Sequence, residues 1–116
     1  MQQLLPRLWE IMCEINRRWC DYLVYSFGED ARVGRNLIIN DGQVHMANLC
    51  LSACYKVNGV SRLHGEILKT DLFRDICEIR PERFTHVTNG IDHRRWLSQI
   101  NPGLDSLIRE LTGGDD

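Results

Sequence analysis

Two Asn-Gly pairs stand in unusual settings, and the asparagine amide of each can both donate and accept hydrogen bonds. The first pair, residues 58–59, is followed by Val60, and the second, residues 89–90, precedes a basic and aromatic run, residues 93–96. Each pair also has a structural interpretation. Asparagine caps helices and glycine permits a positive φ angle, so the first pair fits a helix break and restart. The second fits an ordinary turn. On residue type alone, the structural interpretation of both pairs is favoured.

His64 and the cysteines are the other residues capable of chemistry. A single histidine on an apolar helical face is more often a core residue with one hydrogen bond than a general base or a ligand. His45, Cys50, Cys54 and His64 together match no standard zinc spacing and fit apolar packing instead. We therefore predict no catalytic residue and no metal site among them.

The arginines near the second pair form a local basic cluster that could attract phosphate or nucleic acid. Trp96 lies on the apolar side of its expected helix, and no aromatic platform alternates with the cluster. The formal net charge of the chain is −2, which gives no broad basic field. Salt bridging is the favoured role, and no nucleic-acid partner is predicted. The cluster comprises Arg80, Arg83, Arg94 and Arg95.

The composition limits the classes of protein to which this chain can belong. The chain has 116 residues, enough for one modest core. Its five cysteines are an odd number without a Cys-x-x-Cys pair, which favours free thiols in a reducing, cytoplasmic compartment. Arg7, Glu10 and Glu14 interrupt the apolar N-terminus, so neither a signal peptide nor a membrane span is expected.

Hydrophobic spacing predicts a mainly α chain. Apolar residues at three- and four-residue steps predict a long helix over residues 3–27, ended by Gly28. Residues 37–39 fit either a strand or a helical turn. Residues 43–55 are apolar nearly all round a helix, which predicts a central helix enclosed by other elements.

The second half of the chain contains several local boundary signals. A helix is expected from Val60, and Thr70 is the expected N-cap of the next short helix. Residues 84–87 fit an extended segment. Asp92 is the expected N-cap of one more helix, and residues 101–102, Asn-Pro, open a last helix that runs to Gly113.

Several of these segments resemble the α-glucan (glycogen, starch and maltodextrin) phosphorylases. The resemblance is carried by residues 57–68, 88–97 and 101–104, and also by residues 4–7 and 46–50. Phosphorylases are two-lobed α/β enzymes of the Rossmann-like, GT-B type. The resemblance implies a helical fragment from the lobe junction, with about 1–80 ending the N-terminal lobe and about 81–116 crossing toward the C-terminal lobe. We therefore expect little strand, and apolar faces that are exposed or paired with another copy.

The resemblance also implies functions for particular residues. In the family, the residue matching Val60 packs beside the sugar, and the one matching Asn89 hydrogen-bonds a glucose hydroxyl. An amide suits this contact because it both donates and accepts, as a hydroxyl does. Asn48 and Asp92 depart from the family pattern. Neither is one of the two implied site residues.

The implied parent enzyme uses pyridoxal phosphate to cleave α-1,4-glucan with inorganic phosphate. The cofactor lysine lies in a downstream glycine-rich segment, whereas this chain has only Lys56 and Lys69. No cofactor is therefore expected for this chain, which should be inactive alone. Its expected partners are the missing lobes or another copy of itself. The alternatives are a non-enzymatic helical module that binds glucan or protein, and a helical nucleic-acid binder.

Overall fold

The computed structural model describes residues 2–114 and is mainly helical, as predicted. η1 and η3 are π-helical and η2 is a 3-10 turn. In chain order the elements are α1 (Pro6–Phe27), α2 (Ala31–Arg35), β1 (Ile39–Asn40), β2 (Gln43–Val44), α3 (Met46–Ala53), β3 (Val57–Gly59), α4 (Arg62–Ile67), η1 (Leu68–Leu72), α5 (Arg74–Ile79), η2 (Pro81–Arg83), β4 (Phe84–His86), η3 (Arg94–Gln99) and α6 (Pro102–Thr112).

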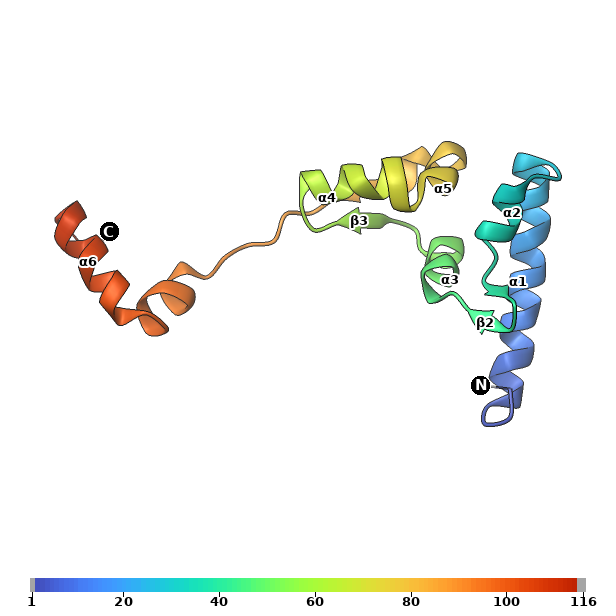
Figure 1. Cartoon of the computed structure of the whole chain (residues 1–116), viewed down its shortest axis with the longest axis horizontal. Coiled ribbons are helices and arrows are strands. Elements are labelled where there is room, and N and C mark those ends of the chain that lie inside the picture. Colours follow the sequence, from blue (N-terminus) through green and yellow to red (C-terminus); the bar gives the residue numbers. More distant parts are fainter. Residues whose placement is uncertain (1, 115–116) are drawn as a thin grey trace.

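The chain is elongated and falls into two parts. Its extents are 65 × 36 × 21 Å and its radius of gyration is 21.9 Å, whereas a compact domain of this length has about 13 Å. The elements from α1 to β4 form the larger part, and an extended connection leads to η3 and α6, which stand apart (Figure 1). The predicted lobe boundary near residue 80 concerns a complete enzyme and stays a prediction. In this structure the separation follows β4.

Helix α1 confirms the predicted long N-terminal helix. Pro6 occupies its first turn, and Gly28, at φ 74°, ends it while donating its N–H to Val24 O at 2.8 Å. Only glycine adopts that φ readily. Trp19 anchors the helix to the next segment, because its indole Nε1 donates to Asn36 O at 2.8 Å.

A small hairpin, which the sequence interpretation missed, follows α2. β1 and β2 pair antiparallel, with Ile39 opposite Val44. Asp41 and Gly42 join them with φ angles of 47° and 72°, which fits a two-residue hairpin turn. The side chain of Asn16 on α1 accepts hydrogen bonds from the backbone of the segment that enters β1. Of the two alternatives for residues 37–39, a strand or a helical turn, the structure therefore favours a short strand, β1.

Helix α3 is shorter and more exposed than predicted. It begins at Met46 because the hairpin occupies residues 43–44. Among its described residues only Leu51 is buried, while Met46 and Cys50, and also the C-cap Cys54, are exposed. The prediction of an enclosed central helix is therefore wrong within this chain. A helix that is apolar all round yet open indicates a surface suited to further packing.

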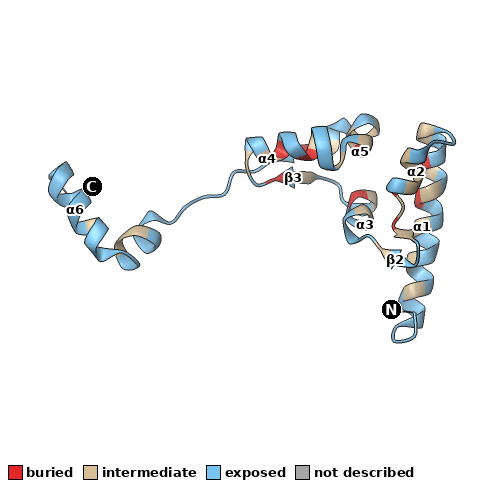
Figure 2. Cartoon of the chain, in the orientation of Figure 1, coloured by how far each residue is buried: buried red, intermediate tan, exposed pale blue. Residues whose placement is uncertain are grey.

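The core runs along the larger part, and Figure 2 shows its buried residues on α1, α3 and the region of β3 and α4. It is thin for a chain of this length. The buried apolar residues are Trp19, Leu23, Ile38, Leu51, Leu68, Ile76 and Phe84. No helix of the described residues is long and apolar enough to span a bilayer.

A β-helix-β unit forms the end of the larger part. β3 and β4 pair in parallel, with Val57 opposite Phe84 and Gly59 opposite His86. Residues 84–86 are extended as predicted, but residues 58–59 lie in a strand, so their interpretation as a helix break is wrong. Thr70 is not an N-cap either. Its hydroxyl donates to Glu66 O at 2.8 Å inside a helix that continues through η1.

Strand β3 and helix α4 approach so closely that they require glycine. A Cβ added to Gly59 would meet Gly65 N and lie 2.6 Å from Gly65 Cα. Both glycines are buried. A Cβ on Gly65 would lie 3.1 Å from the Cβ of His86 on β4. The first Asn-Gly pair therefore uses its glycine for close packing rather than for a turn.

The C-terminal pair of helices follows the predicted boundaries. Asp92 Oδ1 accepts from Arg95 N at 3.1 Å, and Asn101 Oδ1 accepts from Leu104 N at 3.2 Å. Gly113, at φ 75°, ends α6. These capping predictions are confirmed.

Asp105 of α6 contacts η3 through a side-chain hydrogen bond. It accepts from Ser98 Oγ of η3 and from Arg109 Nε of its own helix, both at 2.8 Å. The hydrogen bond from Arg109, followed by that from Ser98, holds the pKa of the Asp105 carboxyl below its usual range. The apolar residues of the pair are largely open to solvent, as expected for a face without a partner. They include Trp96, Ile100, Leu107 and Leu111.

Leu51→Asp should unfold the larger part of the chain. The side chain of Leu51 is 2% exposed, and an unpaired buried carboxylate costs several kcal/mol, comparable with the stability of a small domain. Urea unfolding followed by circular dichroism would measure this loss. Met46→Asp is the control, because Met46 is 55% exposed and lies in the first turn of the same helix. Equal midpoints for both variants and the parent would contradict this core.

Gly59→Ala should destabilise the chain by about 1 to 3 kcal/mol, because the backbone of Gly65 cannot yield as a flexible side chain would. Gly90→Ala should be nearly neutral. Gly90 lacks a positive φ, and an added Cβ would meet no described atom within 4 Å. Chemical denaturation of the two variants measures both effects. A similar loss of stability in both would show that the contact between β3 and α4 is not what requires Gly59.

Candidate functional site

Val60 and Asn89, the two predicted site residues, lie side by side. Val60 follows β3 and Asn89 follows β4. Backbone hydrogen bonds between the two segments continue beyond the C-terminal ends of both strands. Val87 N donates to Gly59 O at 2.9 Å, and Asn89 N donates to Val60 O at 3.2 Å. Ligands of parallel sheets bind outside the carboxyl ends of the strands, and these two residues occupy that position.

The turn that carries Val60 is held by the first residues of α4. Ser61 is the N-cap, and its Oγ accepts from His64 N at 3.1 Å. In return, His64 Nδ1 accepts from Val60 N at 3.1 Å. This pair of bonds is a variant of the capping box, with an imidazole in place of the usual Glu or Gln. His64 therefore has a specific hydrogen-bond partner in the backbone, the N–H of Val60.

At Val60 only the side chain remains available. The backbone N–H and C=O of Val60 are both hydrogen-bonded within the protein. The residue is 48% exposed. Asn89 is exposed, and its side-chain amide makes no hydrogen bond within residues 2–114. The two residues thus offer one amide and one apolar side chain.

The second Asn-Gly pair is not a turn. Residues 87–92 run as an extended connection between the two parts of the chain (Figure 1). The predicted turn is therefore wrong. Asn89 is fixed by the backbone hydrogen bond to Val60, and the connection leaves the larger part of the molecule directly after it.

The two surface hollows described next are not lined by Val60 or Asn89. One of about 450 Å³ lies along α1 and is lined by residues of that helix. Another, of about 250 Å³, is lined by Cys50 of α3 and by Cys54, the C-cap of that helix, together with Lys56 and Phe73. The two thiols lack a third ligand, and residues 2–114 contain no group of three or more side chains able to hold a metal ion.

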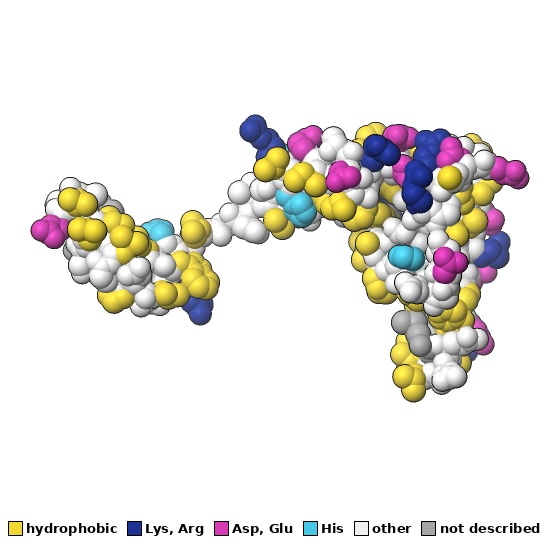
Figure 3. All heavy atoms as spheres, viewed as in Figure 1, with side chains coloured by type: hydrophobic (Ala, Val, Ile, Leu, Met, Phe, Trp, Pro, Cys, Tyr) yellow, Lys and Arg dark blue, Asp and Glu magenta, His cyan; other side chains and the backbone are white. Residues whose placement is uncertain are grey.

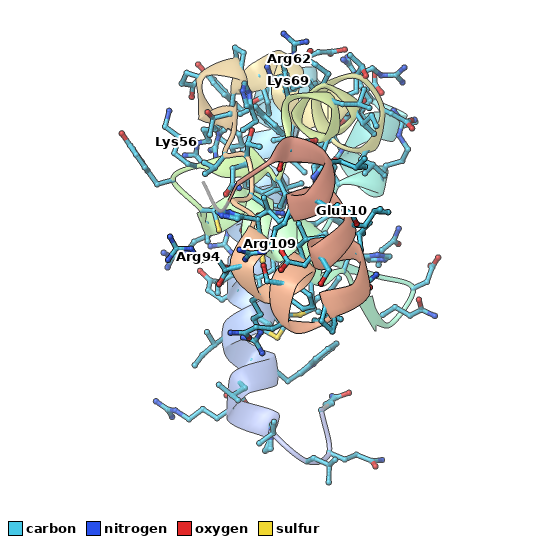
Figure 4. The ribbon with its side chains drawn as sticks, turned by 90° about the vertical axis from the view of Figure 1, so that its left-hand side faces the viewer. Lys56, Arg62, Lys69, Arg94, Arg109 and Glu110 are labelled. Carbon is cyan, nitrogen blue, oxygen red and sulfur yellow. The ribbon has the colours of Figure 1, made fainter. Side chains whose placement is uncertain are left out.

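Neither lysine is placed as a free nucleophile. Lys69 Nζ lies 3.1 Å from Glu66 Oε1, and Lys56 Nζ donates to Glu82 O at 2.6 Å. Both lysines are labelled in Figure 4, on the larger part of the molecule. An amine that forms an imine needs to be neutral and accessible, whereas these ammonium groups are engaged with oxygen atoms.

The predicted basic cluster is dispersed in the structure. Figure 3 shows basic side chains interspersed with acidic ones over the helices of the larger part. Arg83 donates to Cys54 O at 2.9 Å, and Arg80 donates to the Tyr22 hydroxyl at 2.9 Å while stacking on its ring. Arg95 lies over the ring of Trp96, 5.6 Å from its centroid. The cluster therefore forms no continuous basic surface.

Sequence reasoning missed two features of the site. It expected His64 to have one hydrogen bond but did not identify the partner, although the Ser-x-x-His spacing of residues 61–64 is a visible variant of a capping box. It also missed the parallel pairing that brings Val60 to Asn89. Two three-residue strands separated by a helical crossover carry too weak a pattern to reveal that pairing.

Two comparisons with known proteins agree on one family. The profile of the family described as carbohydrate phosphorylase matches residues 1–116. The chain is 42% identical over 119 aligned positions to the muscle form of glycogen phosphorylase from Mus musculus, and 44% identical to the liver form from Homo sapiens. Each alignment covers 99% of this chain and 14% of the relative. The chain spans about one seventh of the length of these relatives, and it belongs to the carbohydrate phosphorylase family.

Proposed function

We propose that this chain is part of a glucan phosphorylase, in which Val60 and Asn89 form part of the wall of the glucose site. The supporting observation is the hydrogen bond from Asn89 N to Val60 O at 3.2 Å. It places an uncommitted amide beside an exposed apolar side chain at the carboxyl ends of two parallel strands. This is a suitable surface for one sugar ring.

The chemistry of the two side chains matches the two kinds of surface on glucose. The amide of Asn89 can accept from one hydroxyl and donate to another. The branched side chain of Val60 can cover C–H groups of the ring without competing for its hydrogen bonds. The parent reaction is phosphorolysis of the terminal α-1,4 bond to give glucose 1-phosphate. Positioning of the sugar is the contribution of these residues to that transfer.

The shape of the chain supports the proposal that it spans a lobe junction. The extended connection carries the backbone out of the part that contains β3 and β4, toward a helical pair with an open apolar face (Figures 1 and 3). In the parent enzyme this pair would belong to the second lobe. The larger part would complete the helical end of the first.

Pyridoxal phosphate would be held by the rest of the enzyme. Lys56 and Lys69 do not fit a cofactor lysine, because their amines are bound to Glu82 O and to the Glu66 carboxylate. No step of the reaction is therefore assigned to them. We propose a cytoplasmic location as well, since all five cysteines are free thiols, of which Cys13, Cys50 and Cys54 are exposed.

A second candidate function is a non-enzymatic helical module that binds glucan or protein. The open apolar residues of the C-terminal pair favour it, because large exposed apolar surfaces on soluble proteins mark contacts. Phosphorolytic activity of a longer protein that contains this segment would decide for the enzyme. Its absence, with binding retained, would decide for the module.

Asn89→Ala, made in a complete phosphorylase that contains this segment, should lower kcat/KM for glucan phosphorolysis by roughly 5- to 150-fold. That range corresponds to about 1 to 3 kcal/mol, the cost of leaving a buried polar partner unsatisfied. Initial rates against glucan concentration measure it. The loss would lie mainly in kcat if the bond tightens in the transition state.

Asn58→Ala is the matched control for Asn89→Ala. Asn58 belongs to the other Asn-Gly pair, and its amide donates only to the adjacent Gly59 O at 3.3 Å among the described contacts. Its loss should leave kcat/KM nearly unchanged. If a well-folded Asn89→Ala enzyme also keeps the parent kcat/KM, Asn89 does not contact the sugar and the proposed wall is wrong.

The 116-residue chain itself should show no phosphorolysis and form no stable imine with pyridoxal phosphate. The expected reason is that neither Lys56 nor Lys69 lies in a glycine-rich segment like the one that carries the cofactor lysine in the family. Absorbance after cofactor addition, followed by borohydride reduction and mass spectrometry, tests this. A complete phosphorylase treated identically is the positive control. Stoichiometric reduction of the cofactor onto Lys56 or Lys69 would contradict the assignment.

A further inference from the structure

We propose that His64 is a positioning residue for this wall. It acts through the backbone of Val60, which in turn fixes Asn89, and it does not itself touch the sugar. This inference rests on the function proposed above for Val60 and Asn89. It assigns to His64 a task beyond that of a core histidine.

The first step is the bond to Val60. This residue lies between the end of β3 and Ser61, the N-cap of α4, so its N–H has no partner within the helix. His64 Nδ1 accepts that N–H at 3.1 Å. An imidazole nitrogen that accepts carries no proton, so the ring presents its N–H at Nε2. The N–H of Val60 belongs to the peptide group between Gly59 and Val60, whose carbonyl, Gly59 O, accepts from Val87 N. The His64 ring therefore helps to fix the orientation of that peptide group.

The second step is transmission to Asn89. The carbonyl of Val60 accepts Asn89 N at 3.2 Å, just beyond the bond from Val87 N to Gly59 O at 2.9 Å. The next backbone hydrogen bond along the described chain, Trp96 N to Asp92 O, lies in the C-terminal part. Val60 O is thus the last backbone acceptor that holds Asn89 before the chain leaves the larger part. A rotation of the peptide group between Gly59 and Val60 would move the Cα of Val60, and with it the Val60 carbonyl of the next peptide group, which holds Asn89 N.

Two substitutions separate the acceptor of His64 from its bulk. In asparagine, Oδ1 is attached to Cγ as Nδ1 is in histidine, so His64→Asn keeps an acceptor near the same place. His64→Leu keeps a branched side chain of similar reach without an acceptor. A merely structural role for His64 would make leucine at least as good as asparagine, since His64 is half-buried on an apolar helix face.

Backbone amide exchange in the 116-residue chain tests the first two steps without any enzyme assay. His64→Leu should raise the exchange rates of the Val60 and Asn89 amides about tenfold, as expected for the loss of one neutral hydrogen bond. His64→Asn should keep both within about threefold of the parent. Ser61→Ala is the control, because it removes the acceptor of the His64 amide and should raise exchange chiefly at His64.

Kinetics in a complete phosphorylase that contains this segment tests the effect on the sugar. His64→Leu should lower kcat/KM about tenfold, and His64→Asn should restore it to within about threefold. In an enzyme that already carries Asn89→Ala, His64→Leu should add little, because the residue through which it acts has lost its amide. Full additivity of the two substitutions would overturn the proposal.

The outcomes separate this inference from the function on which it rests. If Asn89→Ala leaves kcat/KM unchanged, the sugar wall is wrong, and the positioning role falls with it whatever the exchange rates show. If Asn89→Ala is damaging but His64→Leu and His64→Asn behave alike in exchange and in kinetics, the wall stands. Only the positioning role of His64 is then wrong.

Discussion

The parallel pairing of β3 with β4 is the constraint on which the rest of the larger part depends. It joins residues 57–59 to residues 84–86 and so closes a loop that contains α4, η1 and α5. The pairing is possible only because Gly59 and Gly65 let a strand and a helix approach at backbone distance. Two strands of three residues are a small unit, and parallel sheets normally have both faces covered. The helices on one side meet part of that requirement.

The same pairing explains why the candidate site lies where it does. Strands that run in parallel end at the same edge, so the residues after β3 and after β4 meet. Val60 and Asn89 are 29 positions apart in the sequence, yet they share a backbone hydrogen bond. The cap of α4 then fixes the same turn from its other side, through His64. The proposed wall therefore depends on a strand pair and a helix cap together.

Local signals in the sequence predicted the ends of helices well. Gly28, Asn101 and Gly113 each mark a boundary through the conformation or the cap of a single residue, so no distant partner is needed. The length of α1 and the caps of the last two helices were accordingly predictable. Asp41-Gly42 is a signal of the same kind, and reading it as a hairpin turn would have predicted the late start of α3.

Features that depend on distant partners were not predictable in this way. The strand at residues 57–59 contains an Asn-Gly pair, which is typical of turns, and only the approach of α4 and β4 shows why glycine is needed there. The apolar pattern of α3 correctly indicates a helix, but among residues 2–114 no element encloses it. The resemblance of motifs supplied Val60 and Asn89, whereas the hydrogen bond between them came from the structure.

The extended connection has a mechanical consequence for the candidate site. Asn89 lies on the near side of the point at which the two parts separate, and Gly90, just beyond it, has no described atom within 4 Å of an added Cβ. If the C-terminal helices rotated about that point, the pivot of the rotation would lie outside the proposed wall. The spacing between Val60 and Asn89 would then not depend on the position of the C-terminal helices, because the contacts that determine it, the β3–β4 pair and the cap of α4, all lie in the larger part.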